Sequence, residues 1–318
     1  MLSELAIGYL FLGGVGGGSL AVLSALEIAN ARGARIVVAS RVGVGFRGSS
    51  ARSPMPADAL AWSWPLCLGL LALGVLCLLV DLGRPDRLFN LMTSPTLSAI
   101  AVGAWALVAA IVIAGAFSAL ALFDGVCIGM VATCVLSVAG VVVGATVAIY
   151  TGILLQSMAS VLAWQTPLVP IVFVLSSASC GTAVAFLGAV FANTRQVYEH
   201  AIAALARADG AIIVAEAVAL AAFVFWGLGS EGTREAALAL AVGDLAWAFW
   251  GGVVIVGLVV PFVLELFTTF DNHRLQLLWV ATAVLVGAFA LRWCMAGLAA
   301  YDVTQMPEAL FGLAVGSA

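Results

Sequence analysis

Charged residues are scarce in this sequence, and one kind is missing altogether. Only 9% of the 318 residues are charged, 64% are hydrophobic, and none is lysine. The mean hydropathy is +1.20. Because a water-soluble fold needs far more polar surface than this, the composition excludes a soluble globular protein.

Histidine is nearly absent as well. The two histidines, His200 and His273, both fall in predicted loops. Membrane cytochromes b ligate haem through histidines within their helices. The sequence therefore excludes a haem group, and any electrons that this chain handles must be carried by another group.

Cysteines are few and dispersed. A disulfide framework or an iron–sulfur cluster needs thiols close together, and no two cysteines here form a CxxC motif, so we interpret all six as small buried apolar residues. A metal site is the alternative for Cys127 and Cys134, which lie seven residues apart on one helical face, but we expect no metal in this chain. The other four are Cys67, Cys77, Cys180 and Cys294.

Long apolar runs are abundant. Eight runs approach or exceed the ~20 residues that cross a bilayer, which predicts an all-α polytopic membrane protein. They cover about 4–30, 58–80, 96–122, 126–150, 168–193, 209–229, 237–268 and 276–301. The seventh is too long for one crossing, so we expect it to tilt, protrude or kink at Pro261. The longest polar stretch, 31–57, is too short for a soluble domain.

The arginines predict how the chain is oriented. Eight lie in loops after the odd-numbered runs and three on the opposite side, so the first side is cytoplasmic and both termini face outward from the cytoplasmic (inner) membrane. The eight are Arg32, Arg35, Arg41, Arg47, Arg52, Arg195, Arg207 and Arg274, and the three are Arg84, Arg87 and Arg234. Glu4 has no basic residue before it, so we expect the first helix to be a retained anchor and not a cleavable signal.

Residues 81–87, with the sequence Asp-Leu-Gly-Arg-Pro-Asp-Arg, place four charges and a proline at the outer end of the second predicted helix. Charges are costly in the bilayer, so this cluster faces water or a partner protein. A solvated turn with an internal Asp–Arg pair is the alternative.

Two further segments have an unusual pattern. Glycines with GxxxG spacing occur twice in the first helix, at Gly13/Gly17 and Gly14/Gly18. They favour either close helix packing or a flat wall for a planar ligand. The segment 150–170 is apolar but too interrupted to span the bilayer again, so we predict a half-buried stretch at the outer interface.

Four motifs occur in a fixed order along the chain. They are Tyr9-Leu10-Phe11-Leu12-Gly13-Gly14, the 81–87 cluster, Thr93-Ser94-Pro95 with Gly103-Ala104-Trp105, and Tyr150-Thr151-Gly152 with Thr-Pro-Leu-Val-Pro-Ile-Val-Phe at 166–173. Their order and spacing resemble the NrfD/PsrC family, the membrane subunits of polysulphide-reductase-type and nitrite-reductase-type respiratory complexes. The resemblance covers essentially the whole chain. It implies two four-helix bundles, which we place at 1–165 and 166–318, and a quinone site near the face where an iron–sulfur subunit docks.

The resemblance also implies roles for individual residues. Tyr150 matches the family tyrosine that contacts the quinone head group. Tyr9 stands where the polysulphide reductase branch has a histidine, and a phenol there can still donate to a quinone carbonyl. Gly13 and Gly17 complete the expected quinone site. Beside it we expect Asp81 as proton acceptor with Arg84 as its orienting partner, and Arg87 as a docking residue for the partner.

Several ionisable residues fall within predicted spans of the second half. Such charges are expensive and usually mark a pathway or a paired site. We expect Asp244 to pair with Arg292, and Glu216 and Glu265 to extend a carboxylate series toward the cytoplasm. A structural polar network and a proton pathway both remain open. Glu27, in the first helix, is a further carboxylate of this kind.

We interpret the chain as the quinone-reactive anchor subunit of a respiratory oxidoreductase, with menaquinone or ubiquinone as cofactor. We expect that it cannot complete a catalytic turnover without its partner subunits. Expected partners are a four-cluster ferredoxin-like iron–sulfur subunit at the outer face, a molybdopterin or multihaem catalytic subunit and membrane lipid, but no nucleic acid. The alternatives are a secondary transporter or proton channel, and a purely structural anchor.

Overall fold

The computed structural model describes residues 3–41, 57–82, 99–123, 129–158, 161–192, 199–230, 232–267 and 274–302. These residues form helices and turns, and no strand occurs among them. Within the described ranges, eight helical segments are long and apolar enough to cross a membrane. The predicted all-α class and the number of spans are confirmed, and the chain is a multi-pass membrane protein.

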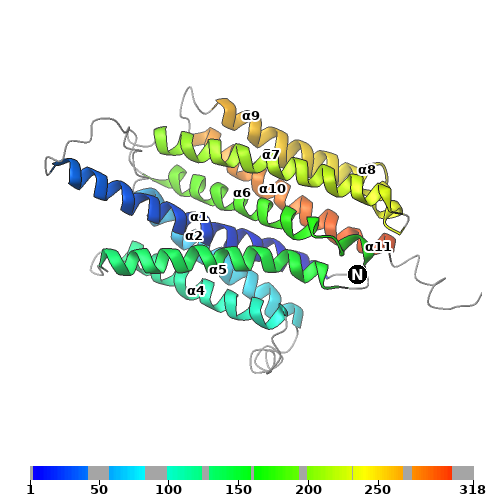
Figure 1. The fold of residues 1–318 in the computed structure, drawn as a ribbon, viewed down its shortest axis with the longest axis horizontal. Helices are drawn as coiled ribbons and strands as arrows, with labels where there is room; N and C mark the ends of the chain where they lie inside the picture. The colour runs from blue at the N-terminus through cyan, green and yellow to red at the C-terminus, as the bar shows by residue number, and fades with distance from the viewer. Residues whose placement is uncertain are drawn as a thin grey trace, which may run out of the picture.

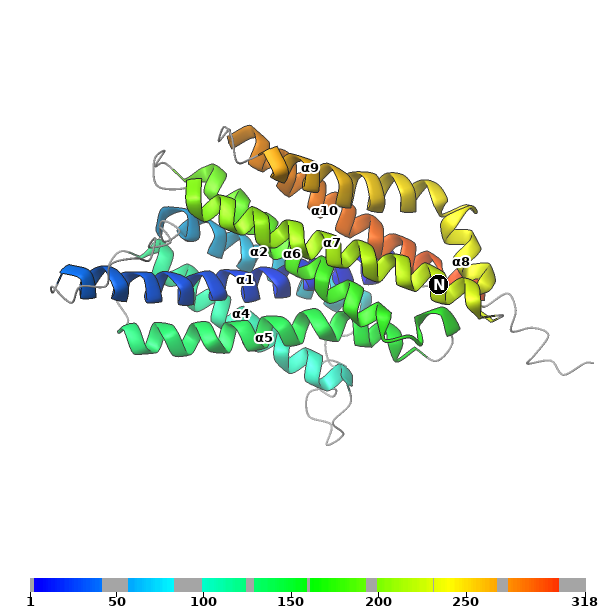
Figure 2. The ribbon, with the colours of Figure 1, turned by 45° about the horizontal axis from the view of Figure 1, so that its top comes forward.

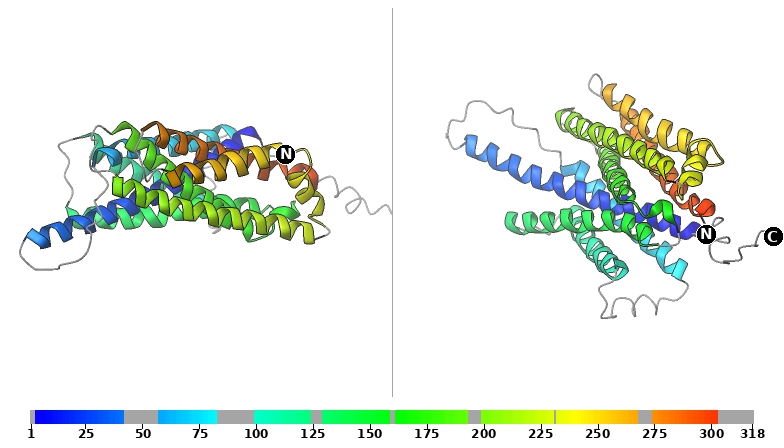
Figure 3. Two further views of the ribbon diagram at one scale, coloured as in Figure 1. Left: turned by 90° about the horizontal axis from the view of Figure 1, so that it is seen from above. Right: turned by 45° about the vertical axis from the view of Figure 1, so that its right-hand side comes forward.

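Four long helices form the first group. They are α1 (Glu4–Arg41), α2 (Ala57–Leu82), α4 (Ala99–Leu122) and α5 (Met130–Gln156). α1 packs against α2 and α5, and α4 packs against the same two helices (Figure 1). At its C-terminal end α1 extends beyond its neighbours, on the side of the molecule opposite to the N-terminus (Figures 2 and 3).

The second group follows a short 3-10 turn, η1 (Leu162–Trp164). It consists of α6 (Leu168–Phe191), α7 (Glu199–Gly229), α8 (Arg234–Ala241), η2 (Ala248–Val259), α9 (Val260–Phe267), α10 (Arg274–Gly297) and α11 (Ala299–Asp302). α6 packs against α7 and α10, while η2 and α9 form one crossing that packs against α10.

α1 and α6 join the two groups, and glycines allow them to touch. A Cβ atom at Gly18 would lie 1.7 Å from the carbonyl oxygen of Ser177, and one at Gly181 would lie 2.4 Å from the carbonyl oxygen of Gly18. No side chain fits between the two backbones at these positions, so the packing interpretation of the glycine pattern is confirmed for Gly18. The division into two domains at residue 165 stays a prediction, because α6 packs on both groups.

Three helices extend six or more residues beyond a predicted end. α1 continues to Arg41, so residues 31–41 are helical and do not form a loop. Residues 42–56 of the predicted loop lie outside the described residues. α7 begins at Glu199, ten residues before the predicted start at 209. α5 continues to Gln156, so Tyr150-Thr151-Gly152 is helical. The prediction of an irregular interfacial stretch was wrong for these residues. Glycine is needed at position 152, because a Cβ atom there would lie only 2.5 Å from Cα of Pro170. The bare backbone of Gly152 therefore packs directly against α6.

The seventh predicted span, 237–268, is broken and not merely kinked. α8 ends at Ala241, and the backbone N–H groups of Val242 and Gly243 both donate to the carbonyl of Leu238 at 2.9 Å. The chain then re-enters as η2, a π-helix whose last bond runs from the N–H of Val260 to the carbonyl of Ile255. Pro261 follows at once and has no N–H to continue that register, so an ordinary α-helix takes over.

Candidate functional site

A pair of buried phenols lies between the helices of the first group. Tyr9 on α1 is 5% exposed and Tyr150 on α5 is 8% exposed. Their hydroxyl groups are close enough to interact with one another. A Cβ atom at Gly13 would lie 3.6 Å from Cε2 of Tyr9 and 3.8 Å from the methyl group of Thr151. The structure thus brings Tyr9, Gly13 and Tyr150 into one neighbourhood, as the sequence predicted.

Gly103 of α4 closes the other side of this pair. A Cβ atom at Gly103 would lie 2.2 to 2.4 Å from three ring atoms of Tyr150. Only glycine lets the phenol ring lie directly against the α4 backbone. Two of the sequence motifs, around Gly103 and around Tyr150, therefore meet at the same place.

Gly17 has a different environment. A Cβ atom there would lie 2.9 Å from Cβ of Val147 and 3.1 Å from the carbonyl oxygen of Gly144. The space beside Gly17 is filled by α5, so this glycine serves the close packing of α1 on α5.

Asp81 lies in the last turn of α2 and is exposed. Its Oδ1 atom accepts a hydrogen bond from Oγ of Ser3. The same Oγ atom accepts a hydrogen bond from the backbone N–H of Ala6 at 3.0 Å and so caps α1. Ser3 precedes Tyr9 by six residues, or about 9 Å along the helix axis. Asp81 is therefore at the same end of the molecule as the phenol pair, while Arg84 and Arg87 lie outside the described residues.

Arg292 of α10 is fully buried where the two groups meet. Its Nε donates to the carbonyl of Leu10 at 3.2 Å, and Nη1 donates to the carbonyl of Ala288 at 2.9 Å and to Oγ of Ser176 at 3.2 Å. Nη2 donates to Oγ of Ser177 at 3.1 Å. Four of the five guanidinium donors are thus satisfied by neutral oxygens from α1, α6 and α10.

Aromatic rings and a glycine complete the Arg292 environment. The guanidinium carbon lies 5.2 Å from the ring centroid of Phe173 and 5.9 Å from that of Phe11, within the range of a cation–π interaction. A Cβ atom at Gly14 would lie 2.5 Å from Nη2. Gly14 therefore leaves room for the guanidinium and not for a ligand.

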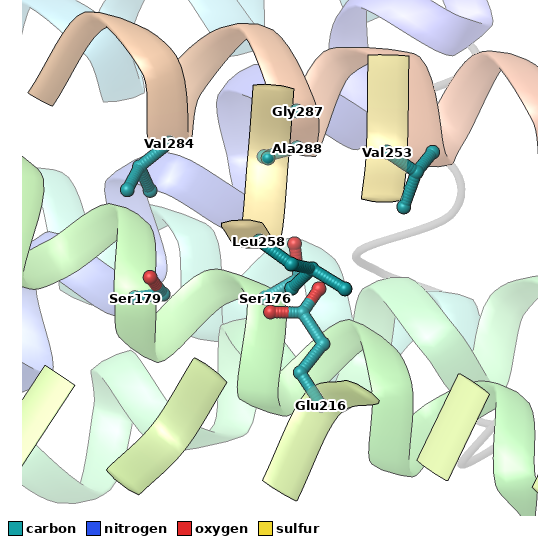
Figure 4. A pocket seen from close by; sticks show the side chains of 9 residues that line it. Ser176, Ser179, Glu216, Val253, Leu258, Val284, Gly287 and Ala288 are labelled. Atoms are coloured by element: carbon teal, nitrogen blue, oxygen red, sulfur yellow. The ribbon is translucent and has the colours of Figure 1, made fainter. Parts of the chain in front are cut away.

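Glu216 of α7 interacts electrostatically with this arginine. Its side chain is buried and reaches toward Ser176 (Figure 4). Ser176 thus links the guanidinium to the carboxylate. A cavity of about 10 Å³ beside these groups is lined by Ser179, Glu216 and Gly287, and it has about the space that one water needs.

The predicted pair between Asp244 and Arg292 is wrong. Asp244 lies in the exposed turn after α8, outside the crossing that begins at Ala248, and accepts a hydrogen bond from the hydroxyl of Tyr301 at 3.0 Å. The prediction failed because the break at Val242 and Gly243 moves Asp244 out of the membrane-spanning helix.

Two other predicted residues have contacts of their own. Glu27 accepts a hydrogen bond from Nε1 of Trp64 at 3.2 Å, and the Trp64 ring is stacked on Phe117 with centroids 4.2 Å apart. The Cys134 side chain is exposed on the surface of α5, so the expectation that this cysteine is buried was wrong. Cys127 lies outside the described residues.

Comparisons with known proteins identify the family of the chain. A family model described as "Polysulphide reductase, NrfD" matches residues 3–300. The chain belongs to the NrfD family. It is 31% identical over 146 residues to "Protein NrfD" of Escherichia coli (strain K12), covering 45% of this chain and 46% of that protein. It is 30% identical over 159 residues to "Protein NrfD homolog" of Haemophilus influenzae, covering 48% of each. The chain thus spans about half the length of the curated relatives it matches.

One buried carboxylate of this NrfD-family chain was missed by the sequence reading. Asp209 of α7 is 0% exposed and lies beside Glu265 of α9. Asp209 is the first residue of the predicted span 209–229, and no role was predicted for it. The signal that marks it is the spacing of seven residues to Glu216, which puts both carboxylates on one helical face.

Proposed function

We propose that this chain is the quinone-reactive membrane subunit of a respiratory oxidoreductase, exchanging electrons between membrane quinol and a partner iron–sulfur subunit. Membership of the NrfD family supports a membrane subunit of a respiratory complex. The observation that carries the quinone assignment is the buried pair of interacting phenols, Tyr9 and Tyr150.

The residues around this pair fit a quinone head group. Each phenol has an O–H that can donate to a quinone oxygen and an oxygen that can accept from a quinol. Gly13 and the Thr151 methyl group add small and apolar surface beside the two rings, and Gly103 lets the Tyr150 ring lie against α4. A quinol supplies two electrons and two protons when it is bound. Tyr9 and Tyr150 would hold its oxygens, and their burial excludes water, which strengthens each hydrogen bond.

Asp81 is the proposed proton acceptor at this end of the molecule. Its carboxylate is exposed, so a proton that it takes can pass to bulk water. Its bond from Ser3 fixes it to the start of α1, the helix that carries Tyr9. We propose Arg84 as its orienting partner and Arg87 as a docking residue.

We further propose the surroundings of the chain from the arginine distribution and the family. Both termini would face outward from the cytoplasmic membrane. A four-cluster iron–sulfur subunit would dock at the outer face, with a molybdopterin or multihaem catalytic subunit beyond it, and menaquinone or ubiquinone would serve as the quinone.

The buried polar residues of the second group support a proton pathway in addition to their structural role. Glu216, Ser176 and Arg292 connect α7, α6 and α10 with the carbonyl of Leu10, which adjoins Tyr9. Glu265 lies nearer the opposite end of the molecule. We propose Glu216, Glu265 and Arg292 as members of this pathway.

Quinol oxidation by the assembled complex tests the proposal. Tyr9→Phe and Tyr150→Phe each remove one hydroxyl and keep the ring, so each should lower turnover by the roughly 0.5–1.5 kcal/mol of a hydrogen bond, about twofold to tenfold. Tyr301→Phe is the matched control, because its hydroxyl bonds to the exposed Asp244. A double variant at positions 9 and 150 that assembles and turns over like wild type would leave the chain as a structural anchor.

A further inference from the structure

Arg207 was expected in a loop, but it lies within a membrane crossing. It is the seventh residue of the crossing Ala201–Gly229, about 9 Å from its start. This crossing has 29 residues and is therefore about 42 Å long, close to the ~40–45 Å of a bilayer with both headgroup layers. Arg207 is thus near the boundary between lipid headgroups and hydrocarbon. Its side chain is exposed, so the guanidinium meets the lipid at this level.

Only part of the Arg207 guanidinium is engaged within the protein. Its Nε donates to the carbonyl of Ala203, one turn nearer the start of α7, at 3.0 Å. This contact bends the side chain toward the headgroup layer, as is common for long basic side chains near the ends of membrane helices. The N–H groups on Nη1 and Nη2 form no hydrogen bond to the residues that the structure describes. They are the donors that a ligand at this position would meet.

A cavity lies beside Arg207, between α7 and α9, which pack side by side (Figure 1). Its volume of about 540 Å³ falls within the ~300–1,000 Å³ of typical ligand sites. On the α7 side it is lined by small residues spaced three or four apart, on one helical face: Ala203, Ala206, Gly210 and Ala211. Because these side chains are short, they leave the space toward α9 unfilled.

The remaining wall of the cavity is apolar and exposed to the bilayer. Phe262 and Leu266 of α9 are 38% and 64% exposed, and Val214 of α7 is 49% exposed. Val214 lies seven residues beyond Arg207, about 10 Å deeper in the membrane. Since there is no water in the bilayer core to fill an apolar groove at this depth, hydrocarbon fills it.

Glu265 of α9 lines the cavity at its inner side. Its side chain is 6% exposed, and its carboxyl group lies within hydrogen-bonding reach of Asp209, which is fully buried. A Cβ atom at Gly210 would lie 3.6 Å from Oε2 of Glu265. Gly210 follows Arg207 by three residues, or about 4.5 Å along the helix axis. The carboxyl group therefore lies deeper than the exposed guanidinium, which is the first charge that a headgroup entering the cavity meets.

We propose that the cavity between α7 and α9 binds an anionic phospholipid, with its phosphate on Arg207 and one acyl chain in the apolar groove between Val214 and Phe262. A guanidinium can bind a phosphate through two parallel N–H···O bonds, and basic pockets between membrane helices recognise such headgroups. A zwitterionic lipid carries its own cation beside the phosphate, so Arg207 gains less from it. The site does not require quinone exchange, and it would stand even if the phenol pair had another role.

Native mass spectrometry of the purified full chain in detergent tests this directly. The probe is dioleoylphosphatidylglycerol, and dioleoylphosphatidylcholine offers the same acyl chains with a neutral headgroup. The wild type should bind one molecule of the anionic lipid roughly tenfold more tightly than the neutral one. Arg207→Gln should abolish this preference and leave binding of the neutral lipid unchanged. Ala211→Phe places a ring in the groove and should weaken binding of both lipids, so it gives a reading of its own if Arg207→Gln does not fold.

Two matched controls separate the site from general effects of charge and bulk. Arg234→Gln removes an exposed arginine at the start of α8, beyond the other end of α7. Ala222→Phe adds a ring to the same face of α7, three turns beyond Ala211 and outside the cavity. Both variants should bind the anionic lipid like the wild type.

Equal binding of the anionic lipid by the wild type and Arg207→Gln would refute the proposal. Tighter binding of dioleoylphosphatidylethanolamine than of the anionic lipid would show recognition of an amine instead. Displacement of the anionic lipid by a short-chain quinone analogue would show a second quinone site. The Tyr9→Phe/Tyr150→Phe double variant should bind the lipid like the wild type, so failure of the quinone proposal and of this one can be told apart.

Discussion

Replacing Arg292 tests how the two helix groups are held together. Arg292→Leu keeps much of the side-chain volume but removes the charge and all four hydrogen bonds to Leu10, Ser176, Ser177 and Ala288. It also leaves the buried carboxyl of Glu216 without its cation. A buried acceptor left without its donor costs roughly 1–3 kcal/mol. Taking about two such acceptors, we expect a loss of about 3 kcal/mol.

Thermal unfolding of the purified chain in detergent, followed by tryptophan fluorescence, measures this loss. At about 2–4 °C per kcal/mol, the midpoint should fall by roughly 6–12 °C. Arg292→Lys keeps the charge but lacks the planar guanidinium group, so it cannot reach the Leu10 carbonyl and both serines together. The unfolding midpoint of this variant should lie between those of the wild type and Arg292→Leu.

A second substitution identifies the carboxylate that depends on Arg292. Glu216→Gln combined with Arg292→Leu removes the unpaired charge and should recover about 1–2 kcal/mol, as expected for residues in one network. Asp244→Asn combined with Arg292→Leu should recover nothing, because Asp244 is exposed and bonded to Tyr301. Strict additivity for Glu216, or recovery by the Asp244 substitution, would refute the network described here.

Two further substitutions probe the fold and the outer end of the site. Gly18→Ala would place a methyl group against the Ser177 carbonyl and should cost about 1–3 kcal/mol in the same unfolding assay. Gly115→Ala is the control and should cost nothing, because its methyl group would meet no atom within 4 Å. Equal stability of the two variants would refute the close contact of α1 and α6. Asp81→Asn keeps an acceptor for Ser3 and should spare assembly but slow quinol turnover, and full activity across the pH range would remove Asp81 as proton acceptor.

The spans were predictable from the sequence because the bilayer fixes their length. The second predicted run, 58–80, differs by one residue at each end from the observed crossing, Ala59–Asp81. Hydropathy reports where the chain leaves the hydrocarbon and not where the helix ends. The helical residues 31–41, which follow the crossing Glu4–Asn30, were missed for this reason.

The contacts between helices were harder to predict. The resemblance placed Tyr9 and Tyr150 together, but no local pattern indicates that Arg292 is satisfied by a carbonyl of α1 and two serines of α6. A buried arginine suggests a carboxylate partner, and Asp244 was expected in the same half of the membrane, since the break after α8 cannot be seen in the hydropathy. Asp209 was missed because the predicted span began at this residue, whereas α7 begins at Glu199.

Quinone binding by the purified chain, without its partner subunits, tests the central claim most directly. A short-chain menaquinone or ubiquinone analogue would be titrated against the wild type, the Tyr9→Phe/Tyr150→Phe double variant and the Tyr301→Phe control. Two lost hydrogen bonds should weaken binding by roughly tenfold or more. The account predicts saturable binding that the double variant loses and the control keeps. Equal binding by all three proteins, or no saturable binding by the wild type, would contradict it.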